Sequence, residues 1–263
     1  MINIIVCMKQ VLDPEAPVSA FKIDPEAKRA IPPKGTPPVL NPNDENALEA
    51  ALKIKDAQPA QITVISMGRQ LARPVVKKSL AVGANDLILL EDDTFEDLDS
   101  YSSAFILAAA IKKIGKYDLI LCGRQAADTD AGQVGSGIAE ILGIPGITIT
   151  RRVQVNDGKL RIERVVSDGY EVVEVSMPAL VTTSNEVGDL RSPNMKAVME
   201  AQKKQFTVWH AADLGIKPAE VKRANMLKLF VPVHEVNVEV VGGETPEEAA
   251  VNLALKMRAN KLV

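Results

Sequence analysis

Residues 117–142 read YDLILCGRQAADTDAGQVGSGIAEIL and contain a strand, a polar glycine-rich loop and a helix in direct succession. The apolar run 117–122 is typical of a strand buried on both faces, and 132–142 predicts a helix. Between them, small residues would let the backbone approach a ligand, and the free N–H groups of a helix start suit a phosphate. The stretch therefore predicts a βα unit with a ligand site at the carboxyl end of its strand.

The same alternation of strand and helix continues towards the amino terminus. Asn41 is a plausible N-cap for a helix there, and Pro42 suits its first position. Repeated βαβ units predict an α/β fold with a mostly parallel, doubly wound, Rossmann-like sheet and right-handed crossovers. The predicted strands and helices are, in chain order, 2–8, 42–57, 62–67, 72–82, 86–90, 99–114, 117–122 and 132–142.

The pattern changes after residue 145. Asp-Gly pairs between alternating β-rich segments are a strong hairpin signal, so 146–176 is predicted to be an antiparallel β meander. Residues 179–183 are expected to return as a core strand, and a shorter hairpin is expected at 21–31. The strands of the predicted meander are 147–155, 160–166 and 170–176.

The chain is predicted to form one α/β domain and a C-terminal extension. The domain spans 1–208 and includes the meander and a polar, basic segment at 185–205. The extension spans 209–263, with a strand at 235–241 and a helix at 246–262. Because the apolar side chains of that helix have few apolar neighbours in the sequence, the extension is expected to dock on a partner as an arm.

Composition excludes several classes of function. The 263 residues carry a net charge of −3 and 3% aromatic residues, which argues against binding of nucleic acid. No apolar run approaches the roughly 18 residues of a membrane span, and the first residues lack a basic signal region, so no membrane insertion and a cytoplasmic location are expected. With 2 cysteines and 2 histidines, and no triad spacing, neither a metal site nor a catalytic residue is predicted.

The residues of the loop 122–137 allow two interpretations each. The sequence holds neither the dinucleotide fingerprint nor a Walker A motif. Its glycines either approach a phosphate or allow close packing of helix on strand. Asp128 and Asp130 either cap a helix or bond to a ribose or base, and Arg124 either faces a pyrophosphate or flavin or lies on the surface. On these residues alone, the chain is a nucleotide-binding α/β protein of unassigned chemistry.

Three stretches together resemble the β subunit of the electron-transferring flavoproteins. They are VCMKQVLD at 6–13, NPNDENALEAA at 41–51, and the loop 122–137 with its CGRQA, Asp-x-Asp and GQVG elements, followed by IAEILG. The combination is highly specific, and the resemblance covers essentially the whole chain. Leu12 and Ala131 depart from the family pattern, which usually has proline and often threonine there.

The resemblance implies a heterodimer with an α subunit that carries another flavin in a mobile domain. In this family the β subunit holds an adenine nucleotide, which is AMP in respiratory members. In electron-bifurcating members it is a second FAD that exchanges a hydride with NAD(H). The RQA and GQVG elements resemble the bifurcating type, so FAD is the expected cofactor, AMP the alternative, and NAD(H) a transient substrate.

The resemblance also implies the electron partners, namely an acyl-CoA or hydroxy-acid dehydrogenase and a low-potential carrier such as ferredoxin. A partner dehydrogenase would dock on an apolar anchor in basic surroundings at 186–199, and the C-terminal helix resembles the arm that embraces the α subunit. An ordinary amphipathic helix over its own core is the alternative for 186–199. A nucleotide sensor like the universal stress proteins is the alternative function from another class.

The resemblance assigns roles residue by residue. The nucleotide would run along the backbone at 8–11, with adenosine at 41–44, the base at 67–68, the ribose or adenine at 128–130 and the phosphates at 132–137. Arg124 would lie towards the flavin, where a cation stabilises the anionic reduced ring. The predicted cofactor-binding residues are Met8, Lys9, Val11, Asn41, Asp44, Met67, Gly68, Cys122, Gly123, Arg124, Gln125, Asp128, Thr129, Asp130, Gly132, Gln133, Val134, Gly135, Ser136 and Gly137. The predicted docking residues are Leu190, Pro193, Met195, Lys196 and Met199.

Overall fold

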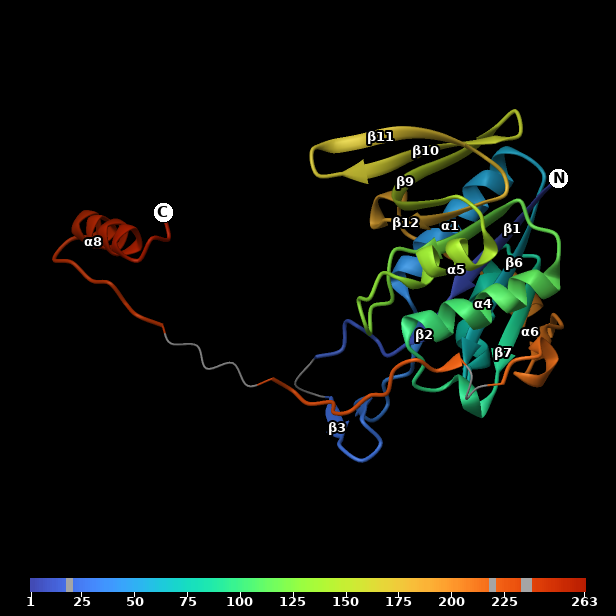
Figure 1. Cartoon of the computed structure of the whole chain (residues 1–263), viewed down its shortest axis with the longest axis horizontal. Coiled ribbons are helices and arrows are strands. Elements are labelled where there is room, and N and C mark those ends of the chain that lie inside the picture. The colour runs from blue at the N-terminus through green and yellow to red at the C-terminus, as the bar shows by residue number, and fades with distance from the viewer. Residues whose placement is uncertain (18–20, 218–220, 233–237) are drawn as a thin grey trace. The chain divides into compact units, whose positions relative to one another are not determined.

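The computed structural model describes residues 1–17, 21–217, 221–232 and 238–263 (Figure 1). They divide into two units, Met1–Lys228 and Leu229–Val263. The first unit holds a nine-stranded sheet with helices on both faces. The predicted extension 209–263 thus begins within the first unit, and its role as an arm stays a prediction.

Apart from the short strand β13, the sheet is parallel where the sequence has apolar runs and antiparallel where it has Asp-Gly turns. The order is β11-β10-β9-β12-β8-β1-β6-β7-β13. The mostly parallel, doubly wound sheet and the antiparallel meander are confirmed. The parallel strands are β1 (Ile2–Met8), β6 (Ala60–Gly68), β7 (Asp86–Glu91), β8 (Leu119–Gly123), β12 (Ala179–Thr183) and β13 (Thr207–Trp209). The meander consists of β9 (Gly146–Asn156), β10 (Lys159–Val166) and β11 (Gly169–Ser176).

The side of the sheet on which the chain adds strands changes at β1. From β1 the chain adds β6 and then β7 on one side, and β8 pairs with the other side of β1. β8 and β6 are both parallel to β1, with Cys7 opposite Cys122 and Met8 opposite Ser66. This change of side is a topological switch point, where open α/β sheets leave a crevice at the carboxyl ends of their strands.

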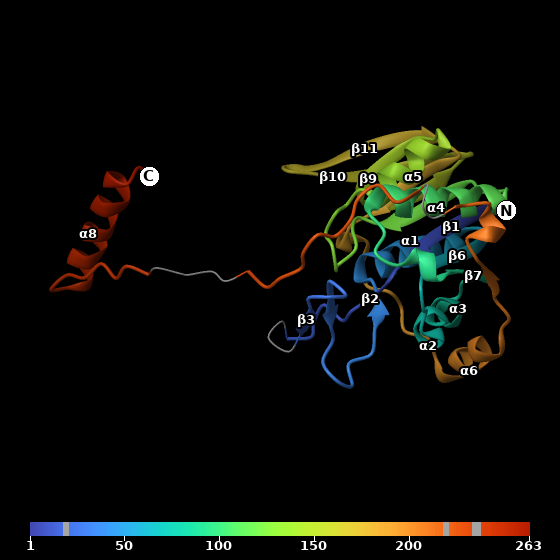
Figure 2. The ribbon, with the colours of Figure 1, turned by 60° about the horizontal axis from the view of Figure 1, so that its bottom comes forward.

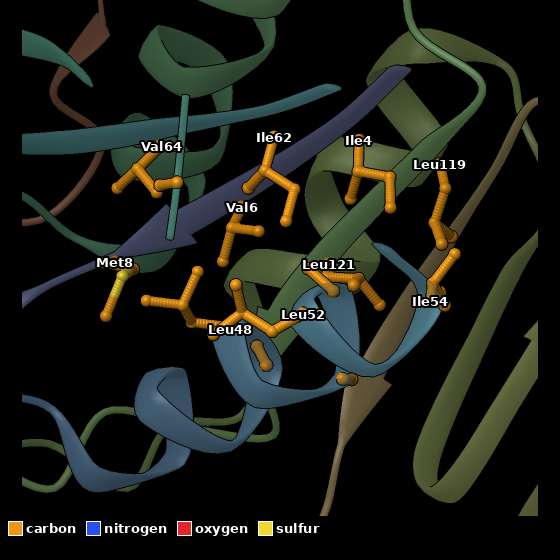
Figure 3. Close-up of a cluster of buried hydrophobic side chains, with 14 of the residues drawn as sticks. Ile4, Val6, Met8, Leu48, Leu52, Ile54, Ile62, Val64, Leu119 and Leu121 are labelled. Atoms are coloured by element: carbon orange, nitrogen blue, oxygen red, sulfur yellow. The ribbon is translucent and has the colours of Figure 1, made fainter. Parts of the chain in front are cut away.

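Two helical layers cover the sheet. α1 (Pro42–Ala57), α2 (Arg73–Val76), α3 (Lys78–Val82) and α6 (Met195–Lys203) lie on one face, while α4 (Ser100–Ile114) and α5 (Val134–Leu142) lie side by side on the other (Figure 2). Alternate side chains of β1 divide between the layers. Ile4, Val6 and Met8 face Leu48 and Leu52 of α1 (Figure 3), whereas Ile5 and Cys7 pack with the α4 layer.

Two predicted helices differ from the structure. The helix expected at 72–82 is two short helices, because the buried Ser79 hydroxyl donates to the Val76 carbonyl and the Leu80 N–H bonds three residues back to Lys77. The helix expected from Gly132 begins at Val134, because Gly132 has a φ of +63°. This left-handed conformation cannot be part of an α-helix.

Short elements surround the carboxyl edge of the sheet. β2 (Gln10–Val11) pairs with β5 (Val39–Leu40), and the hairpin predicted at 21–31 is confirmed as β3 (Lys22–Asp24) and β4 (Arg29–Ile31). Single turns of 3₁₀-helix occur at η2 (Asp93–Phe95), η3 (Asn185–Val187) and η4 (Ala212–Leu214).

The second unit contains α8 (Pro246–Ala259), where the Thr245 hydroxyl accepts a hydrogen bond from the Glu248 N–H. Its side chains Val251, Leu253 and Leu255 are exposed. For the strand predicted at 235–241, residues 235–237 lie outside the described chain, and 238–241 form no strand. No helix among the described residues combines the length and hydropathy needed to cross a membrane.

Candidate functional site

The carboxyl ends of β1, β6 and β8 meet at the switch point, next to the first turn of α1. Asp44, in that turn, joins two of these strand ends. It is 7% exposed, its Oδ2 accepts a hydrogen bond from the Lys9 N–H at 2.8 Å, and its Oδ1 accepts one from the Gly123 N–H at 3.0 Å. The helix start therefore fixes the backbone at the point where β1 and β8 end.

This position changes the acidity of Asp44. Burial raises the pKa of the carboxyl from 3.8 to about 6, and the hydrogen bonds from Lys9 and Gly123 offset only part of the effect. An acid whose folded-state pKa exceeds its unfolded value contributes stability below the unfolded pKa, and that contribution is lost as the pH rises through the folded pKa.

We therefore expect the stability of the wild type relative to Asp44→Asn to fall by about 1 kcal/mol between pH 5 and pH 7. Urea unfolding of both proteins at the two pH values measures this difference. Glu91, Asp92 and Asp99, whose hydrogen bonds lower their pKa values against the effect of burial, are common to both proteins and cancel. Parallel pH profiles for the two proteins would contradict the prediction.

Asn41 holds the loop that follows β8. It stands at the N-cap position of α1, as predicted, but its side chain makes no capping bond. Instead, the fully buried amide donates from Nδ2 to the Gln125 carbonyl at 2.9 Å and accepts at Oδ1 from the Ala127 N–H at 3.0 Å. The Asn41 N–H also donates to the Lys9 carbonyl at 2.8 Å. The predicted contacts of Asn41 and Asp44 with adenosine stay predictions, because both side chains are engaged by backbone groups.

Both acids of the Asp-x-Asp element have a partner, but only that of Asp128 is charged. The Lys9 ammonium lies 2.6 Å from Asp128 Oδ2, which joins the end of β1 to the loop. The Gln125 Nε2 donates to Asp130 Oδ1 at 2.7 Å. The negative charge that would repel a phosphate at this edge is therefore partly compensated. Thr129 is exposed between them.

The stretch leading into α5 offers backbone donors. The N–H groups of 131–133 make no hydrogen bond within the described part of the chain, and the side chains there are exposed. Gln133 stands at the N-cap position, Val134 opens the helix, and Ser136 is exposed in its first turn. A row of free N–H groups at a helix start suits an anion.

Two of the loop glycines have a packing role. A Cβ on Gly135 would lie 2.6 Å from Thr182 Cγ2, and one on Gly137 would lie 2.9 Å from the Ala104 Cβ. These glycines let α5 approach β12 and α4 closely. The packing interpretation therefore accounts for both, and their predicted phosphate contacts stay predictions.

Several predicted residues contribute backbone alone at this edge. Met8 and Val11 are 3% exposed, and Cys122 is buried opposite Cys7. The neighbouring Cys7 thiol and burial raise the pKa of the Cys122 thiol, so it stays protonated, as a small buried apolar residue does. Met67 is half-buried against the α4 layer.

The Arg124 side chain is exposed and makes no hydrogen bond or ion pair with the described residues.

The residues present fit an adenine nucleotide. Ser66, next to the predicted base contacts at Met67 and Gly68, is 1% exposed, and its Oγ has no partner among the described residues. A buried hydroxyl without a protein partner is uncommon in a folded protein, and an ordered water or a polar ligand satisfies it. Together with the free N–H groups of 131–133 and the Lys9 ammonium, it supplies donors of the kinds a nucleotide uses.

Sequence reasoning missed some of the groups that build this edge. Gln10 accepts a hydrogen bond from the Ala72 N–H at 2.7 Å and donates to the Gln70 carbonyl at 3.2 Å, which ties β2 to the loop after β6. Ser66 lies inside a predicted strand. Gln10 stands in the stretch 6–13 that carries the resemblance, but no role is predicted for its side chain, and Ser66 stands in no motif. The partners of Gln10 are more than 50 positions away, so no local signal marks its contacts.

The predicted docking residues lie along α6 and the segment before it. Met195 and Met199 are 78% and 62% exposed, one helical turn apart, and Lys196 is exposed between them. Leu190 and Pro193 are half-buried. The opposite side of α6 packs on the core through Val198 and Ala201. One side of α6 thus covers the core, as the amphipathic alternative predicts, and the other presents methionines, whose docking role stays a prediction.

The fold and this edge define a doubly wound α/β protein whose loop after β8, at the switch point, carries free backbone donors. Residues 34–214 match the family described as electron transfer flavoprotein domain. The caffeyl-CoA reductase–Etf complex subunit CarD of Acetobacterium woodii is 37% identical over 266 residues, covering 99% of this chain and 100% of that protein. The chain belongs to the electron transfer flavoprotein family.

Further relatives place the chain with the β subunits of that family. The β subunit from Thermoanaerobacterium thermosaccharolyticum is 37% identical over 265 residues, covering 99% of this chain and 100% of that subunit. The β subunit from Clostridium acetobutylicum is 41% identical over 232 residues, covering 85% of this chain and 87% of that subunit. The predicted family is confirmed, and the alternative of a stress-protein-like nucleotide sensor is set aside.

Proposed function

We propose that this chain is the β subunit of an electron-bifurcating flavoprotein and holds FAD at its switch point. The observation that carries the proposal is the loop after β8, in which the exposed residues 131–133 have N–H groups without a partner among the described residues, while Asn41 and Asp44 fix the base of the loop. A rigid loop with open donors is suited to bind the phosphates of a dinucleotide.

In this proposal the chain binds and orients the cofactor. The N–H groups of 131–133 and of the first turn of α5 take the pyrophosphate, Ser66 and the backbone at Met67 take the adenine end, and Lys9 with Asp128 lines the entrance. When bound, FAD supplies hydride and single-electron chemistry with NAD(H). Arg124, exposed and unpaired among the described residues, provides a positive charge beside the ring.

The partners proposed for this chain follow from its exposed apolar surfaces. α8 in the second unit takes the α subunit, because Val251, Leu253 and Leu255 are exposed on it. Met195 and Met199 take an acyl-CoA or hydroxy-acid dehydrogenase, and the lysines around them steer an acidic surface towards them. The CarD relative, named as part of a caffeyl-CoA reductase–Etf complex, supports a dehydrogenase-linked role. Ferredoxin is the proposed low-potential carrier and the cytoplasm the proposed location.

Nucleotide content tests the proposal directly. The chain is co-expressed with its α subunit, the purified heterodimer is denatured, and the released nucleotides are separated and quantified. We expect two FAD per heterodimer and no AMP. One FAD with one AMP would replace the proposal with the respiratory type, in which this chain performs no NAD chemistry.

The role of Arg124 has its own test. A cation near an anionic reduced flavin favours reduction, so Arg124→Gln is expected to lower the midpoint potential of the flavin on this chain by roughly 40 mV for a one-electron step, equivalent to about 1 kcal/mol. Spectroelectrochemical titration of the heterodimer measures the shift. Arg152→Gln, which removes an exposed arginine of the meander, serves as the control. An unchanged potential in Arg124→Gln would remove Arg124 from the flavin site.

A further inference from the structure

Arg191 lies within the docking segment 186–199, which carries the exposed methionines, and its side chain contacts two acids of α1. Its guanidinium contacts Glu49 through Nη2 at 2.8 Å and Asp56 through Nη2 at 2.7 Å and Nη1 at 3.3 Å. Its backbone N–H also donates to Glu49 Oε2 at 3.1 Å. Glu49 is 5% exposed, whereas the side chains of Arg191 and Asp56 are 36% and 60% exposed, so the fork is shielded from solvent only on its Glu49 side.

A planar guanidinium held by two carboxylates has a fixed orientation relative to them as well as a fixed distance from them. Arginine offers its donors in a rigid fork, and a bidentate contact allows far less rotation than a single ion pair. Glu49 and Asp56 lie seven positions apart, two turns along α1, so the fork spans the helix surface. The segment leaves this point in one orientation.

Other contacts tie the same segment to the first unit. The Asn46 Nδ2 donates to the Gly188 carbonyl at 2.8 Å, and the Lys53 ammonium donates to the Val187 carbonyl at 2.6 Å. Near the end of α6, the buried Lys77 donates to the Gln202 carbonyl at 2.6 Å. The segment is therefore held at both ends, while Met195 between them remains 78% exposed.

We infer that Arg191 is a positioning residue for partner docking, which sets the orientation in which Met195 and Met199 meet a dehydrogenase without touching it. The inference rests on the proposed docking function of this segment. An anchor presented in one orientation binds a partner more tightly than the same side chains on a loosely held loop, because less conformational entropy is lost on binding. Arg191 thus raises the affinity for the dehydrogenase because it keeps the segment ordered before the partner binds.

The test uses the heterodimer and a purified acyl-CoA dehydrogenase that exchanges electrons with the wild type at a saturable rate. Arg191→Gln is expected to raise KM for the dehydrogenase about tenfold and to change kcat less than about twofold. Arg191→Lys, which keeps the charge but lacks the fork, restores part of the affinity. Asp56→Asn, which removes the more exposed acid, raises KM about threefold. Nucleotide content stays at the wild-type value in all three.

Arg69→Gln is the matched control, because Arg69 also bridges two acids, Asp93 at 2.8 Å and Glu96 at 2.7 Å, but lies outside the docking segment. It is expected to leave KM within about twofold of the wild type. A general effect of losing an arginine that bridges two acids would appear in this variant as well, although its acids are more exposed than Glu49. Equal KM changes in Arg191→Gln and Arg69→Gln would therefore overturn the inference.

Amide hydrogen exchange provides a readout that needs no partner. Arg191→Gln is expected to speed exchange at 194–203 at least about fivefold while leaving 124–142 unchanged. Unchanged exchange at 194–203 would overturn the positioning role. Met195→Glu separates this failure from that of the proposed function, because it removes the anchor itself. If Met195→Glu leaves KM unaltered, the docking function is wrong; if it raises KM while Arg191→Gln does not, only the role of Arg191 is wrong.

Discussion

Gly123→Ala is expected to destabilise the first unit by about 3 kcal/mol or more and to abolish nucleotide retention. A Cβ at this position would lie 2.5 Å from the Asn43 carbonyl carbon, 2.5 Å from Asp44 Oδ1 and 2.7 Å from the Asn43 Cβ. Two of these atoms are fixed by the backbone of α1, so they cannot move aside independently. The third belongs to the carboxylate that holds the Gly123 N–H at 3.0 Å, so relief of the clash breaks that bond.

Gly68→Ala is the control for stability, since Gly68 ends β6, on the other side of β1 from β8, at the same edge of the sheet. A Cβ there would meet only the Leu71 Cδ2 at 3.2 Å, the far end of a flexible side chain. The expected cost is below about 1 kcal/mol. Urea unfolding and the nucleotide retained after gel filtration are measured for both variants. Because Gly68 is itself a predicted base contact, the comparison rests on stability. Equal losses of stability in the two variants would show that the clash with α1 is not the cause.

The alternation of buried strands and helices could be predicted because it is written in local periodicity. Apolar runs such as 2–8 predict strands without any knowledge of what they pair with. The same holds for the meander, where the turns are marked by Asp-Gly pairs. β13 carries no such signal, because it is three residues long and pairs only with β7 at the edge of the sheet.

The contacts that build the site could not be predicted in this way. Asp44 and Gly123 are separated by 79 positions, and Asn41 and Ala127 by 86. The sequence assigned Asn41 to helix capping because Asn before Pro at a helix start is typical of a cap. In the folded chain, backbone groups of the loop after β8 bond to the Asn41 side-chain amide instead. Which partner prevails depends on the register of β1 and β8, which no local pattern encodes.

The glycines of the loop show a related limit. Spacing alone left phosphate contact and helix packing open for Gly135 and Gly137. The distances to Thr182 and Ala104 account for the packing role. The free N–H groups at 131–133, by contrast, are a property of backbone conformation around Gly132, where φ is +63°. A glycine in the loop predicts that a left-handed conformation is possible, and only the structure shows which N–H groups it leaves without a partner.

Asn41→Ala is expected to destabilise the fold by about 2 kcal/mol and to weaken nucleotide binding by up to about 30-fold. The variant leaves the Ala127 N–H and the Gln125 carbonyl without their partner, and both groups are only partly accessible to water. Each unsatisfied group costs about 1 kcal/mol or more. The loop recovers these bonds only by moving towards solvent, and it must then be ordered again when a nucleotide binds.

Asn46→Ala separates loop ordering from a general effect on α1. Asn46 is also a buried asparagine of this helix, but its amide donates to the Gly188 carbonyl, at the start of the docking segment. Asn41→Ala is expected to speed amide exchange at 124–133 and to release nucleotide, whereas Asn46→Ala should speed exchange at 186–191 and retain nucleotide. If both variants lose nucleotide equally, Asn41 acts through the stability of α1. If Asn41→Ala loses nucleotide and Asn46→Ala retains it, the Asn41 side chain orders the phosphate-binding loop before the nucleotide binds.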